Sequence, residues 1–237
     1  MNRLLKFSLL VFLVVFTASV SVSAATVSYG SLAAPGVYYG SGNPNTGFTV
    51  LTEGNLELGL GAIIRYVGPA EQNGNVYKVQ YGPTEVPGKV GSRWGVPFSI
   101  NTQAGGGSMV LSDYNYMVSF NNLTKATSVS FNPMLLPDNS YWGPGGETMI
   151  PDLGNQSGVQ NSEAPSFLFL STLLQFDPMD PDLYRIDLIA TPVNGGQALT
   201  NSIFIDTVPE PSTYALMGAG LFGLLAAHRR RRKQKVS

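Results

Sequence analysis

The chain has 237 residues, with 14 Lys and Arg, 15 Asp and Glu, one histidine and no cysteine. The lack of cysteine excludes disulfide bonds, thiolate catalysis and cysteine-ligated metal sites. The one histidine, His228, lies close to the C-terminus, so the sequence before it cannot supply a Ser-His-Asp triad or histidine-ligated zinc. The core must hold by packing alone, and any hydrolysis would have to depend on paired carboxylates.

The N-terminus has the three parts of a secretory signal peptide. Arg3 and Lys6 form a basic start, an apolar run follows, and small residues occupy positions 23–25. Cleavage after Ala24 or Ala25 fits this pattern, whereas an uncleaved anchor, the alternative, would need a longer apolar run. We predict that residues 1–25 direct export through the secretion machinery and are then removed.

The C-terminus combines a rigid tripeptide, an apolar run and a basic end. Pro209, Glu210 and Pro211 favour an extended chain, because the two prolines fix φ and remove two backbone donors. No charged residue occurs over 212–227, and a helix of that length would be about 24 Å long, a marginal membrane span. A cytoplasmic stop is predicted at four consecutive arginines: Arg229, Arg230, Arg231 and Arg232.

This order of features resembles the PEP-CTERM sorting signal of Gram-negative bacteria that make exopolysaccharide. The resemblance covers residues 208–237 and implies processing by exosortase, a membrane-embedded thiol transpeptidase that recognises the tripeptide and removes the tail. It also implies one C-terminal transmembrane helix, which holds the protein transiently in the inner membrane. After processing, the protein would lie at the cell surface or outside the cell. The alternative is an ordinary membrane anchor that is never cut.

Removing both ends leaves an acidic protein. Two basic residues leave with the signal peptide, and six basic residues and Glu210 leave with the tail. Six basic residues then remain against 14 acidic residues, a net charge of −8. Binding to nucleic acid requires a basic face, so nucleic acid is excluded as a partner. An acidic exported surface is suited to divalent cations or a cationic polymer.

Residues 26–207 are predicted to form one all-β domain. Apolar residues recur at every second position within 55–60, 94–100 and 114–120, and glycine, proline and asparagine lie between these runs. Period-two patterns are typical of half-buried strands. We expect roughly eight to ten strands in a two-sheet antiparallel sandwich.

The end of this domain resembles the last strands of immunoglobulin-like domains. Residues 180–190 place an aspartate and Tyr184 before alternating core residues. In that arrangement Tyr184 would form a tyrosine corner, with a buried ring and a hydroxyl bonded to upstream backbone. A turn at 194–196 would then lead into a final strand over 198–206.

Residues 131–167 lack alternation, and we expect a long loop that is the best place for a binding surface. Tyr141 and Trp142 within it have flat rings that can stack on sugars. The alternative is that this pair plugs the loop onto the sandwich.

Four acids near the last predicted strands are candidate calcium ligands, because Ca²⁺ prefers several oxygen ligands. The glycine-bearing EF-hand pattern is absent, so the alternative is solvated acids, one of which stabilises a turn. The candidates are Asp177, Asp180, Asp182 and Asp187.

We therefore expect an exported surface or extracellular matrix protein, processed by exosortase, with a structural or adhesive role in exopolysaccharide or biofilm. It is expected to be no enzyme and to need no cofactor. The alternative class is a carbohydrate-binding or carbohydrate-cleaving exported protein that uses Tyr141, Trp142 and an acidic pair, with exopolysaccharide as its partner.

Overall fold

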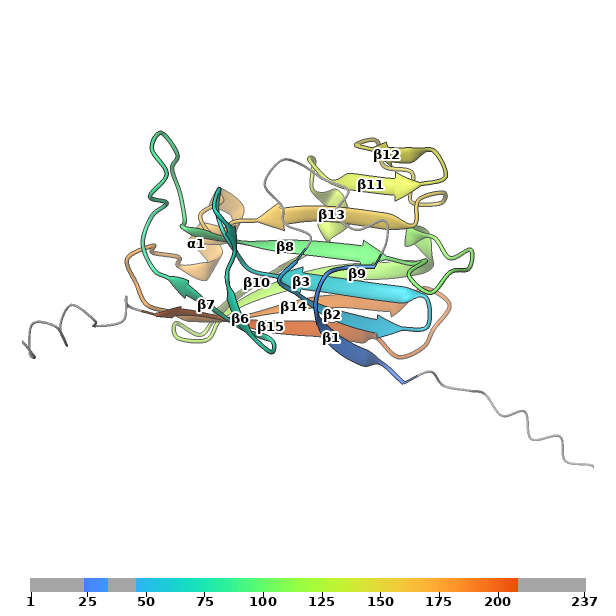
Figure 1. The fold of residues 1–237 in the computed structure, drawn as a ribbon, viewed down its shortest axis with the longest axis horizontal. Coiled ribbons are helices and arrows are strands. Elements are labelled where there is room, and N and C mark those ends of the chain that lie inside the picture. Colours follow the sequence, from blue (N-terminus) through green and yellow to red (C-terminus); the bar gives the residue numbers. More distant parts are fainter. Residues whose placement is uncertain (1–23, 34–45, 209–237) are drawn as a thin grey trace, which may run out of the picture.

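The computed structural model describes residues 24–33 and 46–208, which form two β-sheets packed face to face (Figure 1). No helix within these ranges is long and apolar enough to cross a membrane. The predicted C-terminal transmembrane helix and most of the predicted signal peptide lie outside the described residues. The prediction of an all-β domain in two sheets is confirmed.

The larger sheet has nine strands. Seven of the nine lie side by side in the order β1 (Thr26–Gly30), β2 (Phe48–Glu53), β3 (Leu56–Gly61), β8 (Trp94–Asn101), β13 (Gly158–Glu163), β11 (Ser140–Gly143) and β12 (Gly146–Thr148). Two short strands, β4 (Ile63–Ile64) and β5 (Gly68–Pro69), join this sheet through β8. The pairings along this sheet are antiparallel.

The smaller sheet has six strands. Its order is β10 (Thr127–Phe131), β9 (Tyr114–Asn122), β14 (Leu183–Pro192), β15 (Leu199–Val208), β7 (Val76–Gln80) and β6 (Glu71–Asn73). β15 pairs with β7 in parallel, so the prediction of a fully antiparallel sandwich is wrong at this pair. The two strands are distant in sequence, and a parallel pair needs such a long crossover instead of a hairpin.

Three short helical segments complete the described fold. They are η1 (Leu111–Asp113), η2 (Pro133–Leu135) and α1 (Leu168–Leu174). Figure 1 shows α1 at one end of the sandwich, and α1 contacts β10 and β9 there. This end of the molecule carries the candidate site described below.

The alternating runs in the sequence correspond to β3, β8 and β9. The described residues contain fifteen strand segments instead of the expected eight to ten, because several are only two or three residues long. The predicted loop over 131–167 is wrong: η2, β11, β12 and β13 lie within it. An immunoglobulin-like topology for the last strands stays a prediction.

The core lies between the two sheets. Leu58, Ile100 and Val159 of the larger sheet and Ile186 and Ile203 of the smaller sheet have no exposed surface. Burying a side chain of this kind stabilises the fold by about 1.5–3 kcal/mol. The alternating patterns predict four of these inward residues, whereas Val159 lies in the segment that was predicted to be a loop.

Asn201 of β15 connects the two sheets through a polar contact inside the core. Its Nδ2 donates to the carbonyl oxygens of Thr49 at 2.8 Å and Leu58 at 2.7 Å. Both acceptors lie in the larger sheet, and Asn201 is buried. Because a buried carbonyl without a donor is costly, this asparagine fixes how the sheets sit against each other.

The predicted tyrosine corner is correct for the ring of Tyr184 and wrong for its hydroxyl. The ring is buried and lies 5.1 Å from the ring of Trp94, centroid to centroid. The hydroxyl donates to Asp182 Oδ2 at 3.0 Å instead of to a backbone carbonyl. A buried carboxylate is the stronger acceptor, and it takes the place of the expected backbone partner.

Candidate functional site

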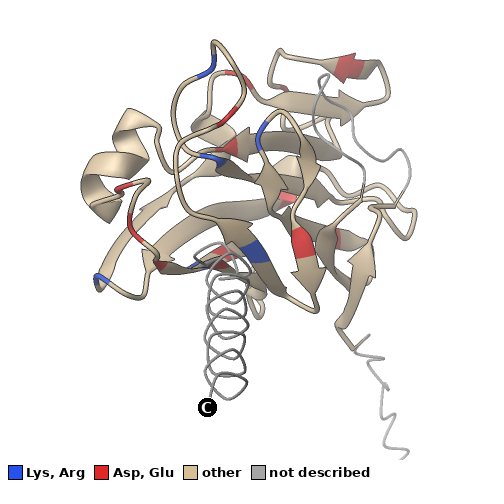
Figure 2. Ribbon diagram, turned by 60° about the vertical axis from the view of Figure 1, so that its left-hand side comes forward, with Lys and Arg blue, Asp and Glu red and all other residues tan. Residues whose placement is uncertain are grey.

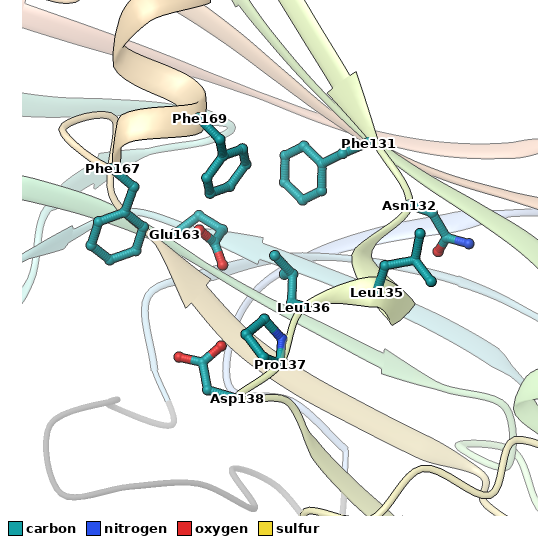
Figure 3. Close-up of a pocket in the computed structure, with 9 residues that line it drawn as sticks. All are labelled: Phe131, Asn132, Leu135, Leu136, Pro137, Asp138, Glu163, Phe167 and Phe169. Atoms are coloured by element: carbon teal, nitrogen blue, oxygen red, sulfur yellow. The ribbon is translucent and has the colours of Figure 1, made fainter.

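An apolar groove lies where β10, η2, β13 and α1 meet, and it encloses a cavity of about 540 Å³ (Figure 3). Three polar residues contribute to its wall, namely Asn132, Asp138 and Glu163. The six apolar side chains that line it are Phe131, Leu135, Leu136, Pro137, Phe167 and Phe169. A groove of this size and composition is typical of sites for small ligands.

The helix α1 positions one wall of the groove. Its residues Leu170 and Leu174, four positions apart, are fully buried and fix the helix on the sandwich. The face of α1 that is turned away from the sandwich is exposed. The ring of Phe169 meets the ring of Phe131 edge-on, with 5.4 Å between the ring centroids. The helix ends at Gln175, whose backbone is left-handed with φ of 51°. The aromatic wall is thus built by the end of β10 and the start of α1.

Glu163 forms the polar end of the groove. It is the last residue of β13 and lies opposite Val96 of β8, on the same side of the strand as the core residue Val159. Its exposed fraction is only 3%. Burial raises the pKa of this carboxyl to about 8, and the nearby charge of Asp138 acts in the same direction. Glu163 therefore holds its proton at neutral pH.

A hydrogen-bond network holds the opposite wall in place. Asn161 Nδ2 donates to Asp138 Oδ1 at 2.9 Å and to Asn139 Oδ1 at 3.0 Å. Asn139 in turn donates to the carbonyl of Pro133 at 2.8 Å. Asp138 itself is exposed. The network fixes the position of Asp138 at the rim, in the same groove as Glu163.

Tyr141 belongs to this supporting wall and does not form a sugar platform. Its exposed fraction is 2%, its hydroxyl donates to the Met134 carbonyl at 3.3 Å, and it accepts from Asn139 Nδ2 at 3.1 Å. The interpretation of Tyr141 and Trp142 as a two-ring platform is wrong, since consecutive residues of a strand point to opposite faces. Trp142 is half-buried on the other face of β11. The alternative, a plug on the sandwich, describes Tyr141.

Two of the calcium candidates form a structural ion cluster instead. Lys125 Nζ lies 2.7 Å from Asp180 Oδ2 and 3.3 Å from Asp182 Oδ2. Asp182 is buried and also accepts from Asn122 Nδ2 at 2.9 Å and from the Tyr184 hydroxyl. Burial opposes the charge on Lys125, but its hydrogen bonds to the two acids outweigh this and raise its pKa. Both carboxylates thus have partners from the chain itself.

The other two candidates lie elsewhere. Asp187 of β14 accepts from Arg185 Nε at 2.8 Å and from the Ser202 hydroxyl at 2.6 Å. Asp177 accepts from the backbone of Met179 at 2.8 Å, which stabilises a turn. Within 24–33 and 46–208, no group of three acids or histidines is placed to share a metal ion. The calcium interpretation is therefore not supported, and the turn-stabilising alternative describes Asp177.

Charged residues are spread over both sheets and the connecting loops (Figure 2). Three basic residues are engaged with acids: Arg93 with Glu85, and Lys125 and Arg185 in the contacts above. No lysine or arginine of the described residues lines the groove. The groove is thus apolar, with the negative charge of Asp138 at its rim and no compensating positive charge in its wall.

The chain continues directly from a central strand into the tail. β15 pairs with β14 on one side and with β7 on the other, and its last residue, Val208, is in register with Gln80. A model of the PEP-CTERM protein-sorting motif matches residues 207–232. The chain carries a PEP-CTERM sorting signal. The signal implies export, anchoring in the membrane before processing by exosortase, and location at the surface afterwards.

The sorting signal includes the predicted recognition tripeptide and the predicted stop. Pro209, Glu210 and Pro211 fall within the matched range, and so do the four arginines at 229–232. These residues lie outside the part that the structure describes, so their individual roles stay predictions. The motif match leaves the folded domain without a family assignment, because it covers only the end of the chain.

Other comparisons concern the folded domain. No curated protein matches the sequence. One similar solved structure is a family 123 glycoside hydrolase from Clostridium perfringens, at 10% identity and a TM-score of 0.30; the match covers 65% of this chain and 28% of the hydrolase. Another is the CooA pilin subunit from enterotoxigenic Escherichia coli, at 12% identity and a TM-score of 0.25; the match covers 64% of this chain and 99% of the pilin subunit. Neither likeness is close enough to carry an argument about function.

Sequence reasoning missed the groove. Glu163 and Asp138 fall in the segment that was expected to be a loop, and only spacing could have pointed to them. Val159, Asn161 and Glu163 occupy every second position, the period of a strand. Two of these three residues are polar, so the pattern does not mark a buried face.

Proposed function

We propose that the exported domain is a structural or adhesive component of the exopolysaccharide or biofilm matrix. The observation that carries this proposal is the direct connection between a PEP-CTERM signal and a central strand of a closed sandwich. Such a connection supports a domain that is placed outside the cell as a rigid unit. The mechanism is binding and placement, with exposed parts of both sheets available for contacts.

We also propose that the domain is not an enzyme. Asp182 and Asp187 accept hydrogen bonds from neighbouring side chains, which supports a structural use of both. Glu163 and Asp138 remain as a possible acid pair, and a raised pKa is what a general acid requires. Glycosidases, however, also hold sugar hydroxyls with polar groups, and this groove presents mostly leucine, proline and phenylalanine.

Carbohydrate binding is the second candidate function. Trp142 is half-buried on β11, next to the edge strand β12 of the larger sheet. The next residue, Gly143, borders a second cavity of about 300 Å³ whose polar lining includes Asp152, Asn155 and Gln156. An aromatic ring beside amide and carboxylate groups is suited to a sugar. With Tyr141 buried, stacking at this place would depend on Trp142 alone.

The matrix role is tested in the producing cells. Cells that lack the protein are compared with cells that make it and with cells that make the P209A/P211A variant, and the protein and polysaccharide retained in the washed matrix are measured. We expect the matrix to lose cohesion without the protein and the variant to be depleted from it. Unchanged cohesion in all three would reject a structural or adhesive role.

Two further measurements separate the alternatives. The W142A variant binds the cells' own polysaccharide as the unchanged protein does if sugar stacking is not its function, whereas a clear loss of binding would establish the carbohydrate-binding candidate. Release of reducing ends from that polysaccharide by the purified mature protein would reject the proposal that the domain is not an enzyme.

A further inference from the structure

Glu163 is a buried acid with no partner in the fold. Within the described part of the chain, no hydrogen bond reaches its carboxylate, although 97% of the residue is removed from solvent. Figure 3 shows that the carboxyl points into the groove, between Phe169 and Leu136. Among the described residues, the only fully enclosed side-chain polar atom without a partner is the Tyr116 hydroxyl, so the carboxyl oxygens of Glu163 are open to the groove. A carboxyl that receives no donor from the fold and opens into a cavity can be satisfied by a partner from outside the chain.

The surroundings of Glu163 determine the charge of that partner. Asp138 places a negative charge at the rim, and Asn132 is the only other polar residue among the nine that line the groove. A cation beside one lining residue is Arg65, whose guanidinium lies 5.7 Å from the Phe167 ring and donates to the carbonyls of Val90 and Ser92. The guanidinium of Arg65 is thus already engaged in contacts with Val90, Ser92 and Phe167. The groove therefore repels anions and attracts cations.

We propose that this groove is a binding site for a small ligand that joins an apolar body to a protonated amine, with Glu163 as the counter-ion of the amine. The rings of Phe131 and Phe169 and the side chain of Leu136 contact the apolar body. The cavity of about 540 Å³ matches the size of sites for small molecules. This inference is independent of the matrix role proposed above.

Binding of the amine releases a proton. In the empty groove Glu163 holds its proton below about pH 8. When an ammonium group enters, the ion pair stabilises the carboxylate, and the carboxyl proton passes to the solvent while the amine keeps its own. No covalent bond changes. Above the pKa of Glu163 the carboxylate is already charged, and the release disappears.

The test uses mature protein purified from the producing cells and three probes of equal length: phenylbutylamine, phenylbutanol and phenylbutyrate. Titration calorimetry at about pH 6.5, in buffers of different ionisation enthalpy, measures affinity and proton release together. We expect the amine to bind at least roughly tenfold more tightly than the alcohol, the carboxylate to bind more weakly still, and close to one proton to be released. At about pH 9.5 the release should vanish.

Variants locate the effect. E163Q keeps the shape of the side chain, and it should lose both the proton release and the preference for the amine while alcohol binding stays within about threefold. E147Q, on the remote strand β12, should bind as the unchanged protein does. If E163Q fails to fold, D138N is measured in its place. It should bind the amine several-fold more weakly and should still release the proton.

Three results would overturn the proposal. The first is equal affinity for the three probes, and the second is amine binding without proton release at about pH 6.5. The third is a lysine-containing peptide that binds at least roughly tenfold more tightly than phenylbutylamine, because the occupant would then be a protein segment instead of a small molecule.

Discussion

The glutamine variant of Glu163 should remove a pH dependence of folding that the unchanged protein shows. The folded-state pKa is about 8, and the ordinary value is 4.5. Between these values the folded protein holds the proton while the unfolded chain has lost it. The free energy of unfolding therefore falls as pH rises through this window and levels off above it.

The size of the effect follows from the two pKa values. One pKa unit corresponds to about 1.4 kcal/mol, so the contribution of Glu163 between about pH 5 and about pH 7.5 is a loss on the order of 3 kcal/mol. In E163Q this loss is absent, because the amide does not titrate. Glu57 also has a raised pKa through burial, so it gives both proteins a similar slope. The difference between the two proteins isolates Glu163.

The assay is urea unfolding across this pH range, followed by the fluorescence of the buried Trp94. E71Q serves as the control, since it makes the same substitution at Glu71, which is exposed on β6. It should follow the unchanged protein at every pH. Parallel curves for the unchanged protein and E163Q would refute the reasoning, because they would mean that Glu163 titrates in the same way in the folded and unfolded states.

The remaining predictions concern the polar contacts inside the fold, each measured by urea unfolding at neutral pH. N201A removes a donor from each of two carbonyls in the core and should cost about 2–4 kcal/mol. A cost under about 1 kcal/mol would contradict a role in joining the sheets. D182N should lower the free energy of unfolding by about 2–3 kcal/mol, because Asp182 is buried. D180N should lower it by under about 1 kcal/mol, because Asp180, the other partner of Lys125, has a side chain that is 47% exposed. Equal losses would contradict this difference between the two acids. Y141F should lower the free energy of unfolding by about 1 kcal/mol, because the hydrogen bond from the hydroxyl to the Met134 carbonyl is lost. No change would mean that this hydrogen bond does not stabilise the fold.

The strands with strict alternation could be predicted from the sequence. Trp94, Phe98 and Ile100 point inwards from β8, and Val118 and Phe120 do so from β9. In these strands apolar residues occur at every second position because one face of the strand packs against the opposite sheet. The burial of the Tyr184 ring was predicted from the resemblance of residues 180–190 to an immunoglobulin-like strand.

The groove could not be predicted, because its strand carries polar residues on the buried face. Asn161 and Glu163 occupy inward positions of β13, where alternation would require apolar side chains. Their burial depends on partners far away in the chain, such as Asp138, and on the aromatic wall that α1 supplies. Local patterns contain no information about such tertiary contacts. The parallel pairing of β7 with β15 was missed for the same reason.

The intact mass of the mature protein, from the cell surface and from the medium, tests the central claim most directly. We expect a mass that lacks the N-terminal signal peptide and everything beyond the Pro209–Pro211 region. Both cut sites then lie outside the two-sheet domain. Protein that still carries Arg229–Arg232 at its final location would contradict removal of the tail by exosortase.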